Sequence, residues 1–583
     1  MNSEKSLPEK YVLFSLLALA LAVRLWGIHF GLPFVYHVDE AWFGQKAINY
    51  FTGDLNPHFW HAPSLFTYLV AAVWSIYFLA GKIFGKFTTA ASFIKAFNDD
   101  PSVFLVLGRL LTVFLSVATI YLVYLIGKRM YNERVGFLAA LFLIFSPEHN
   151  RISHYMNPDS PMVFFLALSF LFIWRIYKTG KGKYYALAGI SAGLAFATKY
   201  GGHMLFIPLF LAHLFYVLEN RLPKKRIILH LPLIGSALLF LMTFLAACPY
   251  VFLDFPAFWK DFRWQSEHLY TLGHFGSSTA QPSALFYLQY GFRENIGLIA
   301  QFLVAGGLIY GLWRFRRREV LLFSFPVLLF ITISPWKTYA TRYLLPAAPF
   351  FILIAAFFLD AALKGLSNLL GSFSGKKWAG FTAAGLIVLF ILVPSAVSVF
   401  RLDWSLAHKD TRTVARDWIY DNIPEKSKVA FEAYCPLLSE NRYRLFSRQP
   451  SLSQIDLEWL AQKKVEYVVV SELEYGRFAP YPEEFPKEAN FYRSLDEKAV
   501  LIKTIAPRWH EDLLTMHNPI IKIYRLSRCP DVSFPGNFSR YAQHIALLRT
   551  EGDRWVLRTE VSAGGLRQAG EVIKSLYVRI VDA

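Results

Sequence analysis

The stretch SVFLVLGRLLTVFLSVATIYLVYLI, residues 102–126, decides the fold class, because it is long enough and apolar enough to cross a lipid bilayer as one helix. It carries a single charged residue, Arg109, and is followed by Gly127-Lys128-Arg129. Similar apolar runs recur through the first 400 residues. The whole chain is 55% hydrophobic and only 17% charged, whereas an ordinary soluble domain has about 25% charged residues. The sequence therefore predicts a polytopic α-helical membrane protein.

On either side of this stretch, basic clusters alternate with further apolar runs. The apolar runs lie near 11–29, 63–84, 102–126, 136–147, 160–177, 184–198, 203–218, 227–247, 294–313, 320–334, 343–363 and 379–400. The basic clusters lie within 128–134, 178–183, 221–226, 314–318 and 364–377. Cytoplasmic loops carry an excess of Lys and Arg, so all five clusters are predicted to be cytoplasmic.

The run at 63–84 breaks this alternation, because an odd number of runs separates Lys10 from the first basic cluster. We interpret it as a helix in or dipping into the membrane interface, within one external segment at 30–101. About eleven spans result, with the N-terminus cytoplasmic and the C-terminus outside. The run at 136–147 is short, and its span must include flanking residues.

The composition changes after Arg401, where charged residues become frequent and long apolar runs stop. The sequence predicts two domains, a transmembrane domain at 1–400 and an extracytoplasmic soluble α/β domain at 401–583. Its expected helices are 411–422 and 454–463, and its expected strands are 428–434, 465–471, 499–505 and 520–526, with a further strand pair at 555–561 and 576–581. Cys435 and Cys529 could form a disulfide if this domain is extracytoplasmic.

A formal net charge of +18 would indicate a nucleic-acid partner in a soluble protein. Here the basic residues lie in short loops between spans, where they set orientation and meet anionic lipid, so no nucleic acid is expected. Neither GxxxxGK[ST], nor GxGxxG after a strand, nor G-x-S-x-G is present. An enzyme without a nucleotide site could use a lipid-linked donor that arrives from within the bilayer.

Asp39 and Glu40 open an amphipathic segment just after the first apolar run. An acidic pair beside a bilayer is costly to desolvate, which favours a catalytic role. The alternative is that Asp39 only caps a helix while Glu40 favours its dipole. Asp159, where a later span begins, could likewise be a cap. Two acidic sites at the same membrane depth are harder to explain by capping alone.

A set of cations and aromatic residues is predicted on the same external side. Any one of them could be an ordinary interfacial residue, but together they could hold a phosphate. The set comprises His61, Lys199, Lys337, Arg342 and Tyr343, with Arg109 and Arg24 as weaker candidates inside spans. A divalent metal could be held by Asp39, Asp159 and His268, although no HxxxH or CxxC spacing supports one.

The order of these motifs resembles the GT-C glycosyltransferases, and within them the family 39-like group of protein O-mannosyltransferases and bacterial lipid A aminoarabinose transferases. The resemblance covers most of 1–400 and part of the α/β domain. One departure is that the chain has Trp60-His61-Ala62-Pro63 where aminoarabinose transferases have Glu-Lys-Pro-Pro. The motifs that carry the resemblance are His37-Val38-Asp39-Glu40-Ala41, His61-Ala62-Pro63, Arg109-Leu110, Gly127-Lys128-Arg129, Ser146-Pro147 with Asp159, Thr198-Lys199-Tyr200 and Arg342-Tyr343-Leu344-Leu345-Pro346.

The resemblance implies a bacterial-type enzyme of the plasma membrane that takes a sugar from a polyprenyl-monophosphate donor. It passes the sugar to a hydroxyl of a protein, lipid or glycan acceptor, with inversion. It further implies that Asp39 is the base, that Asp159 supports the site, and that the basic residues and Tyr343 face the lipid phosphate. The alternatives are a transporter or flippase for a lipid-linked or small solute, and a non-catalytic assembly subunit.

Overall fold

The computed structural model describes residues 9–274, 276, 282–374, 377–447, 451–510, 515–526, 549–551 and 554–556. The chain divides into two compact units, 1–526 and 527–583. In the second unit, the described residues form one short antiparallel pair, β6 (Arg549–Glu551) with β7 (Arg554–Val556). The strands expected at 555–561 and 576–581 lie largely or wholly outside the described residues, as does Cys529.

Long helices dominate the first unit and confirm the predicted class of polytopic α-helical membrane protein. Their positions follow the apolar runs, because each run buries its side chains in the bundle or presents them to lipid. The helices are α1 (Glu9–Leu25), α5 (Ser102–Met130), α6 (Glu133–Ile144), α8 (Asp159–Thr179), α9 (Gly182–Thr198), α10 (Phe206–Glu219), α11 (Leu231–Ala247), α16 (Ala300–Arg314), α17 (Arg317–Ile333), α18 (Ala348–Ser374) and α19 (Lys377–Ala407).

Seven helices of the described chain are long and apolar enough to cross a membrane, or eight if one bent pair is a single span. The bent pair joins 283–296 to Ala300–Arg314 at 105°. Gly297 lies at the bend with a φ of 111°, a conformation that favours glycine. The interfacial run α3 (Leu65–Ile83) also passes by length and composition, so these criteria leave its placement, and the number of about eleven spans, as predictions.

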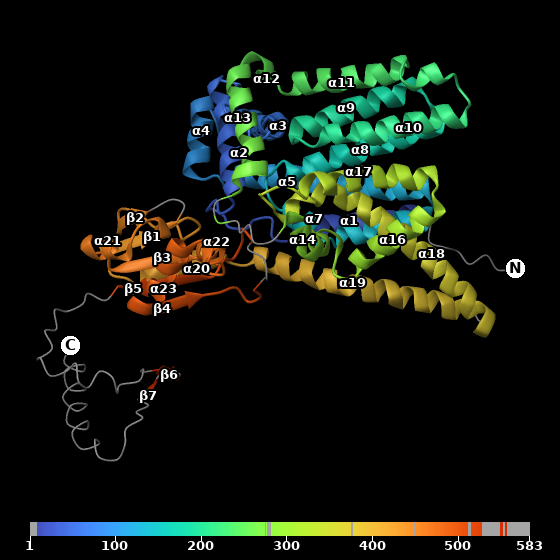
Figure 1. The fold of residues 1–583 in the computed structure, drawn as a ribbon. Helices are drawn as coiled ribbons and strands as arrows, with labels where there is room; N and C mark the ends of the chain where they lie inside the picture. Colours follow the sequence, from blue (N-terminus) through green and yellow to red (C-terminus); the bar gives the residue numbers. More distant parts are fainter. Residues whose placement is uncertain are drawn as a thin grey trace, which may run out of the picture. The chain divides into compact units, whose positions relative to one another are not determined.

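Shorter helices lie at one end of this bundle. They are α2 (Val38–Asn49), α4 (Ala90–Asp99), α7 (Pro147–Ser153), α12 (Tyr250–Leu253), α13 (Phe255–Glu267), α14 (Ser283–Phe286) and α15 (Phe292–Ile296). In Figure 1, α8 to α11 run side by side, while α2, α4 and α13 run across their direction. The first helices after the N-terminal span thus form a layer over the ends of the spans.

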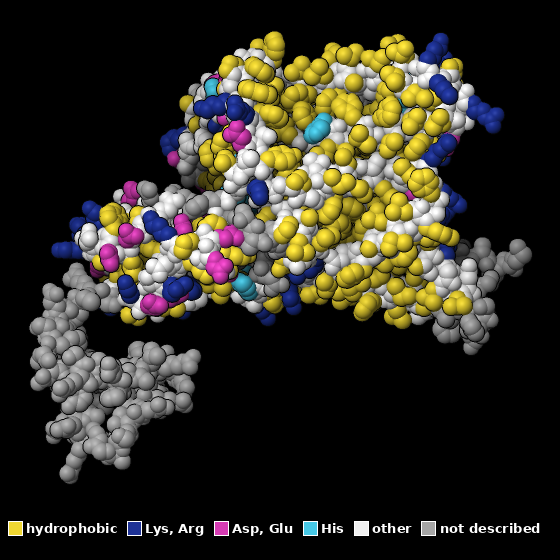
Figure 2. Space-filling model, viewed as in Figure 1, with side chains coloured by type: hydrophobic (Ala, Val, Ile, Leu, Met, Phe, Trp, Pro, Cys, Tyr) yellow, Lys and Arg dark blue, Asp and Glu magenta, His cyan; other side chains and the backbone are white. Residues whose placement is uncertain are grey.

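Side-chain chemistry separates the two ends of the bundle. On the face in Figure 2, hydrophobic side chains cover the long helices, and many of the Lys and Arg side chains lie along one edge. At that end Lys128 pairs with Glu9 at 2.5 Å, and Arg317 pairs with Glu219 at 3.0 Å. The loops predicted to be cytoplasmic therefore meet at a common end.

The α/β part of the first unit contains a five-stranded mixed sheet in the order β2-β1-β3-β5-β4. β1 pairs in parallel with β2 and β3, whereas β5 is antiparallel to β3 and β4. The elements are α20 (Thr411–Asn422), β1 (Lys428–Phe431), β2 (Arg444–Ser447), α21 (Leu457–Gln462), β3 (Tyr467–Ser471), α22 (Glu472–Phe478), α23 (Pro486–Lys498), β4 (Val500–Ile505) and β5 (Ile521–Arg525). Four strands match the sequence expectation; the short edge strand β2 was missed, because its side chains are only half buried.

Candidate active site

Helix α2 positions the acidic pair. Its apolar face buries Phe43, Ala47 and Ile48, and it packs against Phe66 and Val70 of α3. These residues recur at helical spacing, so the sequence of α2 itself forces one face onto the protein. The first turn, with Asp39 and Glu40, is left at the end that meets the spans.

Glu40 is fixed by Arg109 of α5 in a fully buried, bidentate ion pair. Nε and Nη2 of Arg109 donate to the two Glu40 carboxylate oxygens at 2.7 Å each, and both side chains are 0% exposed. Nη1 of Arg109 donates to the carbonyls of Ile28 and Phe30, and the Met156 amide donates to Glu40 Oε1. These contacts tie α2 to the bundle. The Glu40 carboxylate and the Arg109 guanidinium therefore serve to position the helix.

Asp39, the neighbouring residue, pairs instead with Arg342. Arg342 Nη1 donates to Asp39 Oδ2 at 2.6 Å, and the two side chains keep 33% and 28% of their surface exposed. Burial, the largest single influence, acts to raise the pKa of Asp39, but Arg342, His37 and Lys199 together outweigh it and lower the pKa to about 2. In turn the Asp39 carboxylate raises the pKa of Arg342 above its ordinary value. The site presents a carboxylate that is ionised and still reachable from solvent.

A second ion pair, Lys199 with Asp159, stands beside the first. Lys199 Nζ donates to Asp159 Oδ1 at 2.5 Å; Asp159 opens α8 and Lys199 directly follows α9. The Tyr343 ring lies 5.6 Å from Lys199 Nζ and 5.9 Å from the Arg342 guanidinium carbon, within reach of cation–π attraction. Two cations thus contact one ring.

The two pairs also act on each other electrostatically. After burial and Arg342, the Lys199 ammonium further lowers the pKa of Asp39. After Asp39 and burial, the Asp159 carboxylate helps to raise the pKa of Arg342. We call Asp39, Asp159, Lys199 and Arg342, together with the adjacent Tyr343, the four-charge cluster. The structure brings together residues from α2, α8, the end of α9 and the segment before α18.

Two other predicted residues, His61 and His268, lie in a column of aromatic rings. His61 stacks on Phe59 at 4.9 Å between ring centroids and lies 4.4 Å from Trp264, which in turn stacks on His268 at 4.9 Å. His61 Nε2 is 4.0 Å from the Asp261 carboxylate. Burial lowers the pKa of both His61 and His268. These contacts place both histidines in packing roles.

Lys337 is exposed, and its backbone amide donates to the Leu269 carbonyl at 2.7 Å. This bond ties the segment before Arg342 to the segment after α13. A phosphate contact by Lys337 stays a prediction, because the described contacts give its ammonium no defined position at the cluster.

Sequence reasoning missed a carboxylate network next to Arg342. Glu148 Oε2 accepts from Thr341 Oγ1 at 3.0 Å and from Arg151 Nη1 at 2.5 Å. Arg151 Nη2 donates further to Glu294 at 3.2 Å. Burial, the largest influence, raises the pKa of Glu148. The presence of Glu148 in an external loop was the available signal, but its partners come from distant segments.

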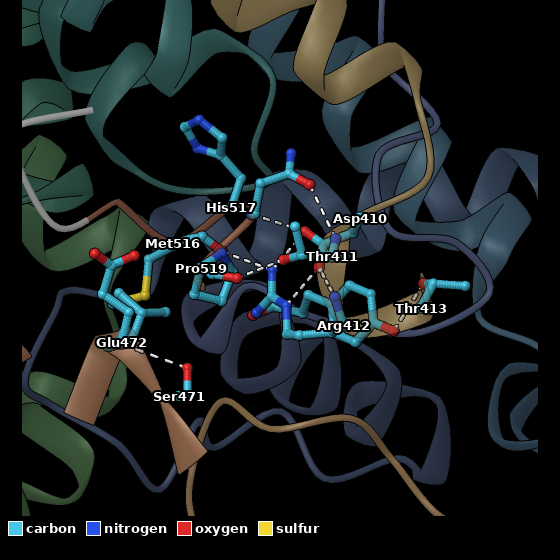
Figure 3. Close-up of polar contacts among 12 residues, drawn as sticks. Asp410, Thr411, Arg412, Thr413, Ser471, Glu472, Met516, His517 and Pro519 are labelled. Carbon is cyan, nitrogen blue, oxygen red and sulfur yellow. Dashed lines mark hydrogen bonds and ion pairs between the residues drawn. The ribbon is translucent and has the colours of Figure 1, made fainter. Parts of the chain in front are cut away.

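A junction between the α/β part and the segment that leads from α1 to α2 was also missed (Figure 3). Arg412 is 1% exposed and pairs bidentately with Asp410 through Nε and Nη2, at 2.7 and 2.8 Å. Arg412 Nη1 donates to the Tyr36 carbonyl at 3.2 Å, and Nη2 donates to the Met516 carbonyl at 2.9 Å. Tyr36 stands three residues before Asp39, so the α/β part holds the approach to the acidic pair.

The same approach is packed by His37, which precedes α2. Its ring lies 4.2 Å from the Tyr155 ring, and the Tyr155 hydroxyl is 3.2 Å from Nδ1 of His517. Burial lowers the pKa of His37 despite the neighbouring carboxylates of Asp39 and Glu40. A neutral imidazole at this position avoids a third cation beside Arg342 and Arg109.

The metal site considered from the sequence does not fit the arrangement. Among the residues that the structure describes, no group of three or more His, Cys, Asp or Glu side chains could hold a metal ion. Asp39 and Asp159 each carry a cationic partner, and His268 stacks in the ring column. We therefore derive no step through a metal.

The chain is similar in sequence to known proteins over part of its length. The family model described as "Dolichyl-phosphate-mannose-protein mannosyltransferase" matches residues 102–247. Dolichyl-phosphate-mannose–protein mannosyltransferase 1 of Candida albicans is 29% identical over 203 residues, 33% of this chain and 22% of that protein. The chain therefore spans about a fifth of the length of the curated relative that it matches.

Two solved structures are similar to this chain at low sequence identity. The oligosaccharyltransferase of Archaeoglobus fulgidus tethered with an acceptor peptide has a TM-score of 0.50 and 14% identity, covering 86% of this chain and 73% of that chain. ArnT of Cupriavidus metallidurans bound to undecaprenyl phosphate has a TM-score of 0.48 and 13% identity, covering 88% and 98%.

The chain shares the fold of the archaeal oligosaccharyltransferase. Its residues 102–247 match the model of the dolichyl-phosphate-mannose-protein mannosyltransferase family. These similarities are to membrane glycosyltransferases of the GT-C class. The transporter alternative is not favoured, since the matched family and the curated relative transfer sugars.

Proposed function

We propose that the chain transfers a glycosyl group from a polyprenyl-monophosphate sugar to an acceptor hydroxyl at the extracytoplasmic face, with inversion. The observation that carries this proposal is the convergence of Asp39, Asp159, Lys199 and Arg342 at one end of the bundle. A lipid-linked sugar phosphate needs two things there: cations for its phosphate and a carboxylate for the acceptor proton.

Arg342 and Lys199 can exchange their carboxylate partners for the phosphate of a donor. Arg342 neutralises Asp39, and Lys199 neutralises Asp159. When a donor phosphate enters, both cations turn toward it, and the two carboxylates lose part of their compensation. The pKa of Asp39 then rises from about 2 toward or above its ordinary value, because burial is no longer outweighed. Asp39 becomes a stronger base only when the donor is bound.

Bond making and breaking follow from these positions. The acceptor hydroxyl attacks the anomeric carbon while its proton passes to Asp39, and the bond from the anomeric carbon to the phosphate oxygen breaks. Negative charge gathers on the departing polyprenyl phosphate, where Lys199 and Arg342 stabilise it. A single displacement inverts the configuration. Glu40 and Arg109 act as positioning residues for α2.

Membrane orientation is part of the proposal. The N-terminus and the basic loops lie in the cytoplasm, and the external segment 30–101 and domain 401–583 lie outside, in a bacterial plasma membrane. The gathering of basic residues near Glu9 and Glu219 supports this orientation through the positive-inside rule. The contact of Arg412 with the Tyr36 carbonyl supports placing 401–583 on the side of the acidic pair.

The acceptor is a protein, lipid or glycan hydroxyl, which domain 401–583 helps to admit. This role is supported by the junction around Arg412, which joins that domain to the segment carrying Asp39.

The test is release of polyprenyl phosphate from a labelled donor by the purified full chain in vesicles. The first probe is polyprenyl-phosphate mannose, after the matched family, and the acceptor is supplied by membranes of the host. Release that depends on Asp39 and Lys199 supports the proposal. Facilitated movement of the intact donor across the vesicle membrane, without release, overturns it in favour of a transporter.

A further inference from the structure

A cavity separate from the four-charge cluster lies where three helices of the bundle meet the α/β part. Its volume is about 460 Å³. The bundle contributes α7, α15 and the C-terminal half of α19, and the α/β part contributes Trp509 and His510. None of the roles proposed above uses this space.

The charge lining the cavity is mainly positive. Three guanidinium groups come from three separate elements, Arg151 of α7, Arg293 of α15 and Arg401 of α19. Glu294 is the carboxylate of the lining, and it accepts from Arg151 and Arg293 at 3.2 Å each. The guanidinium carbon of Arg401 lies 5.9 Å from the centroid of the Trp509 ring, and Arg401 has no ion pair within the described part of the chain. Arg401 therefore contributes an uncompensated positive charge to the lining, which attracts an anion.

The membrane side of the cavity is apolar. Leu298, Pro394 and Val397 contribute to the lining, and Leu298 and Val397 keep 49% and 41% of their surface exposed. The stretch 382–422, which contains the α19 part of the lining, is one of the candidate membrane spans. A small soluble anion gains nothing from this apolar surface, whereas the first methylene groups of a lipid are stabilised by contact with it.

We propose that this cavity binds the phosphate-bearing headgroup of an anionic lipid from the outer leaflet. Arg401 and Arg293 contact the phosphate, and Leu298 and Val397 contact the start of the acyl chains. The site is distinct from the donor phosphate site at Lys199 and Arg342.

The cavity is also joined to the four-charge cluster. Arg151 lines the cavity and donates to Glu148, and Glu148 accepts from Thr341, the neighbour of Arg342. A bound lipid phosphate competes with the carboxylates for Arg151, so occupancy of the cavity is coupled to the position of Arg342.

The experiment counts lipids bound to the purified full chain by native mass spectrometry. The probes are dioleoyl phosphatidylglycerol, dioleoylglycerol with the same tails but no phosphate, and inorganic phosphate as competitor. One saturable phosphatidylglycerol is expected, with no matching binding of dioleoylglycerol. Arg401→Gln and Arg293→Gln each weaken it about tenfold to a hundredfold, the effect of losing one charged hydrogen bond.

Matched variants separate the proposal from trivial causes. Arg263→Gln, which removes an exposed α13 arginine paired with Glu267, leaves phosphatidylglycerol binding unchanged. Leu298→Gln weakens phosphatidylglycerol but not inorganic phosphate. Lys199→Gln weakens polyprenyl phosphate and spares phosphatidylglycerol, so failure of the transfer proposal and of this one remain distinguishable.

Three outcomes overturn the inference. Dioleoylglycerol could bind as tightly as phosphatidylglycerol, which would make the cavity a tail pocket. Inorganic phosphate could displace the lipid at equal concentration, which would make it a soluble-anion site. Arg401→Gln, with an unchanged melting temperature and unchanged polyprenyl phosphate binding, could leave phosphatidylglycerol affinity intact.

Discussion

Asp39→Asn should change turnover and product binding in opposite directions. Transfer falls by about 10²–10⁴-fold, the usual contribution of a general base. Binding of free polyprenyl phosphate becomes tighter, because Arg342 no longer has to leave a carboxylate before it meets the phosphate. A variant that merely misfolds would lose both.

The size of the gain in binding follows from the ion pair. Burial alone would raise the pKa of Asp39, yet its partners hold it at about 2, against an ordinary value of 3.8. At 1.36 kcal/mol for each pKa unit, the attraction of its partners therefore exceeds the cost of burial by about 2.4 kcal/mol. Releasing Arg342 from Asp39 should therefore raise the affinity for the lipid phosphate by about sixtyfold.

Two assays on one preparation test the reasoning. Turnover is release of polyprenyl phosphate from labelled donor, and affinity is equilibrium binding of polyprenyl phosphate in detergent. Asp54→Asn is the matched control, because Asp54 lies in the same external segment and pairs with exposed His58; it should change neither quantity. A folded Asp39→Asn chain that transfers at the wild-type rate, or that binds the product no more tightly, would refute the exchange of partners.

Three further changes test neighbouring parts of the site. Arg342→Gln should shift the acid limit of kcat/KM upward, because kcat/KM reports the pKa values of the enzyme before the donor binds. In the free wild type the pKa of Asp39 is about 2, and without the guanidinium burial raises it. A profile of kcat/KM between pH 7 and 4 should therefore fall in the variant and not in the wild type. Arg109→Leu leaves the Glu40 carboxylate buried without its ion-pair partner, so it should cost about 3–5 kcal/mol of stability, seen as a lower melting temperature. The Glu40→Leu/Arg109→Leu double variant removes both charges and should melt at a higher temperature than the single variant. A lower melting temperature in the double variant counts against the pairing. Arg412→Lys cannot keep both the bidentate pair and the Tyr36 contact, so kcat should fall about tenfold with unchanged affinity for polyprenyl phosphate, whereas parallel losses in both would indicate general disruption.

The helices were predictable because a helix that spans a membrane requires a long apolar run of sequence. Runs near 102–126 and 379–400 became α5 and α19 with added turns at their ends. The run near 294–313 is the exception, since the chain turns by 105° between α15 and α16. Apolar composition measures transfer into lipid and carries no information on such a bend.

Candidate site residues were predictable in kind but not in partnership. A charge at the end of a span is costly, so Asp39, Asp159 and Lys199 stood out by position. That Asp39 meets Arg342, 303 residues away, depends on the packing of the whole bundle. Sequence spacing cannot supply such a contact, and for the same reason it grouped Arg109 with the phosphate ligands.

Asp39 and Glu40 show why adjacent acids have different tasks. Successive residues of a helix point about 100° apart, so the Glu40 side chain can face the bundle while the Asp39 side chain stays partly exposed. Glu40 is 0% exposed and pairs with Arg109, which also holds two carbonyls, whereas Asp39 keeps 28% exposure and one displaceable partner. To act as a base, Asp39 must separate from Arg342 during each turnover, whereas Glu40 must keep its pair with Arg109 to hold α2 in place. Because α2 is a rigid helix, the rigidity of the Glu40 pair fixes the direction of Asp39, and the mobility needed for chemistry is confined to Arg342.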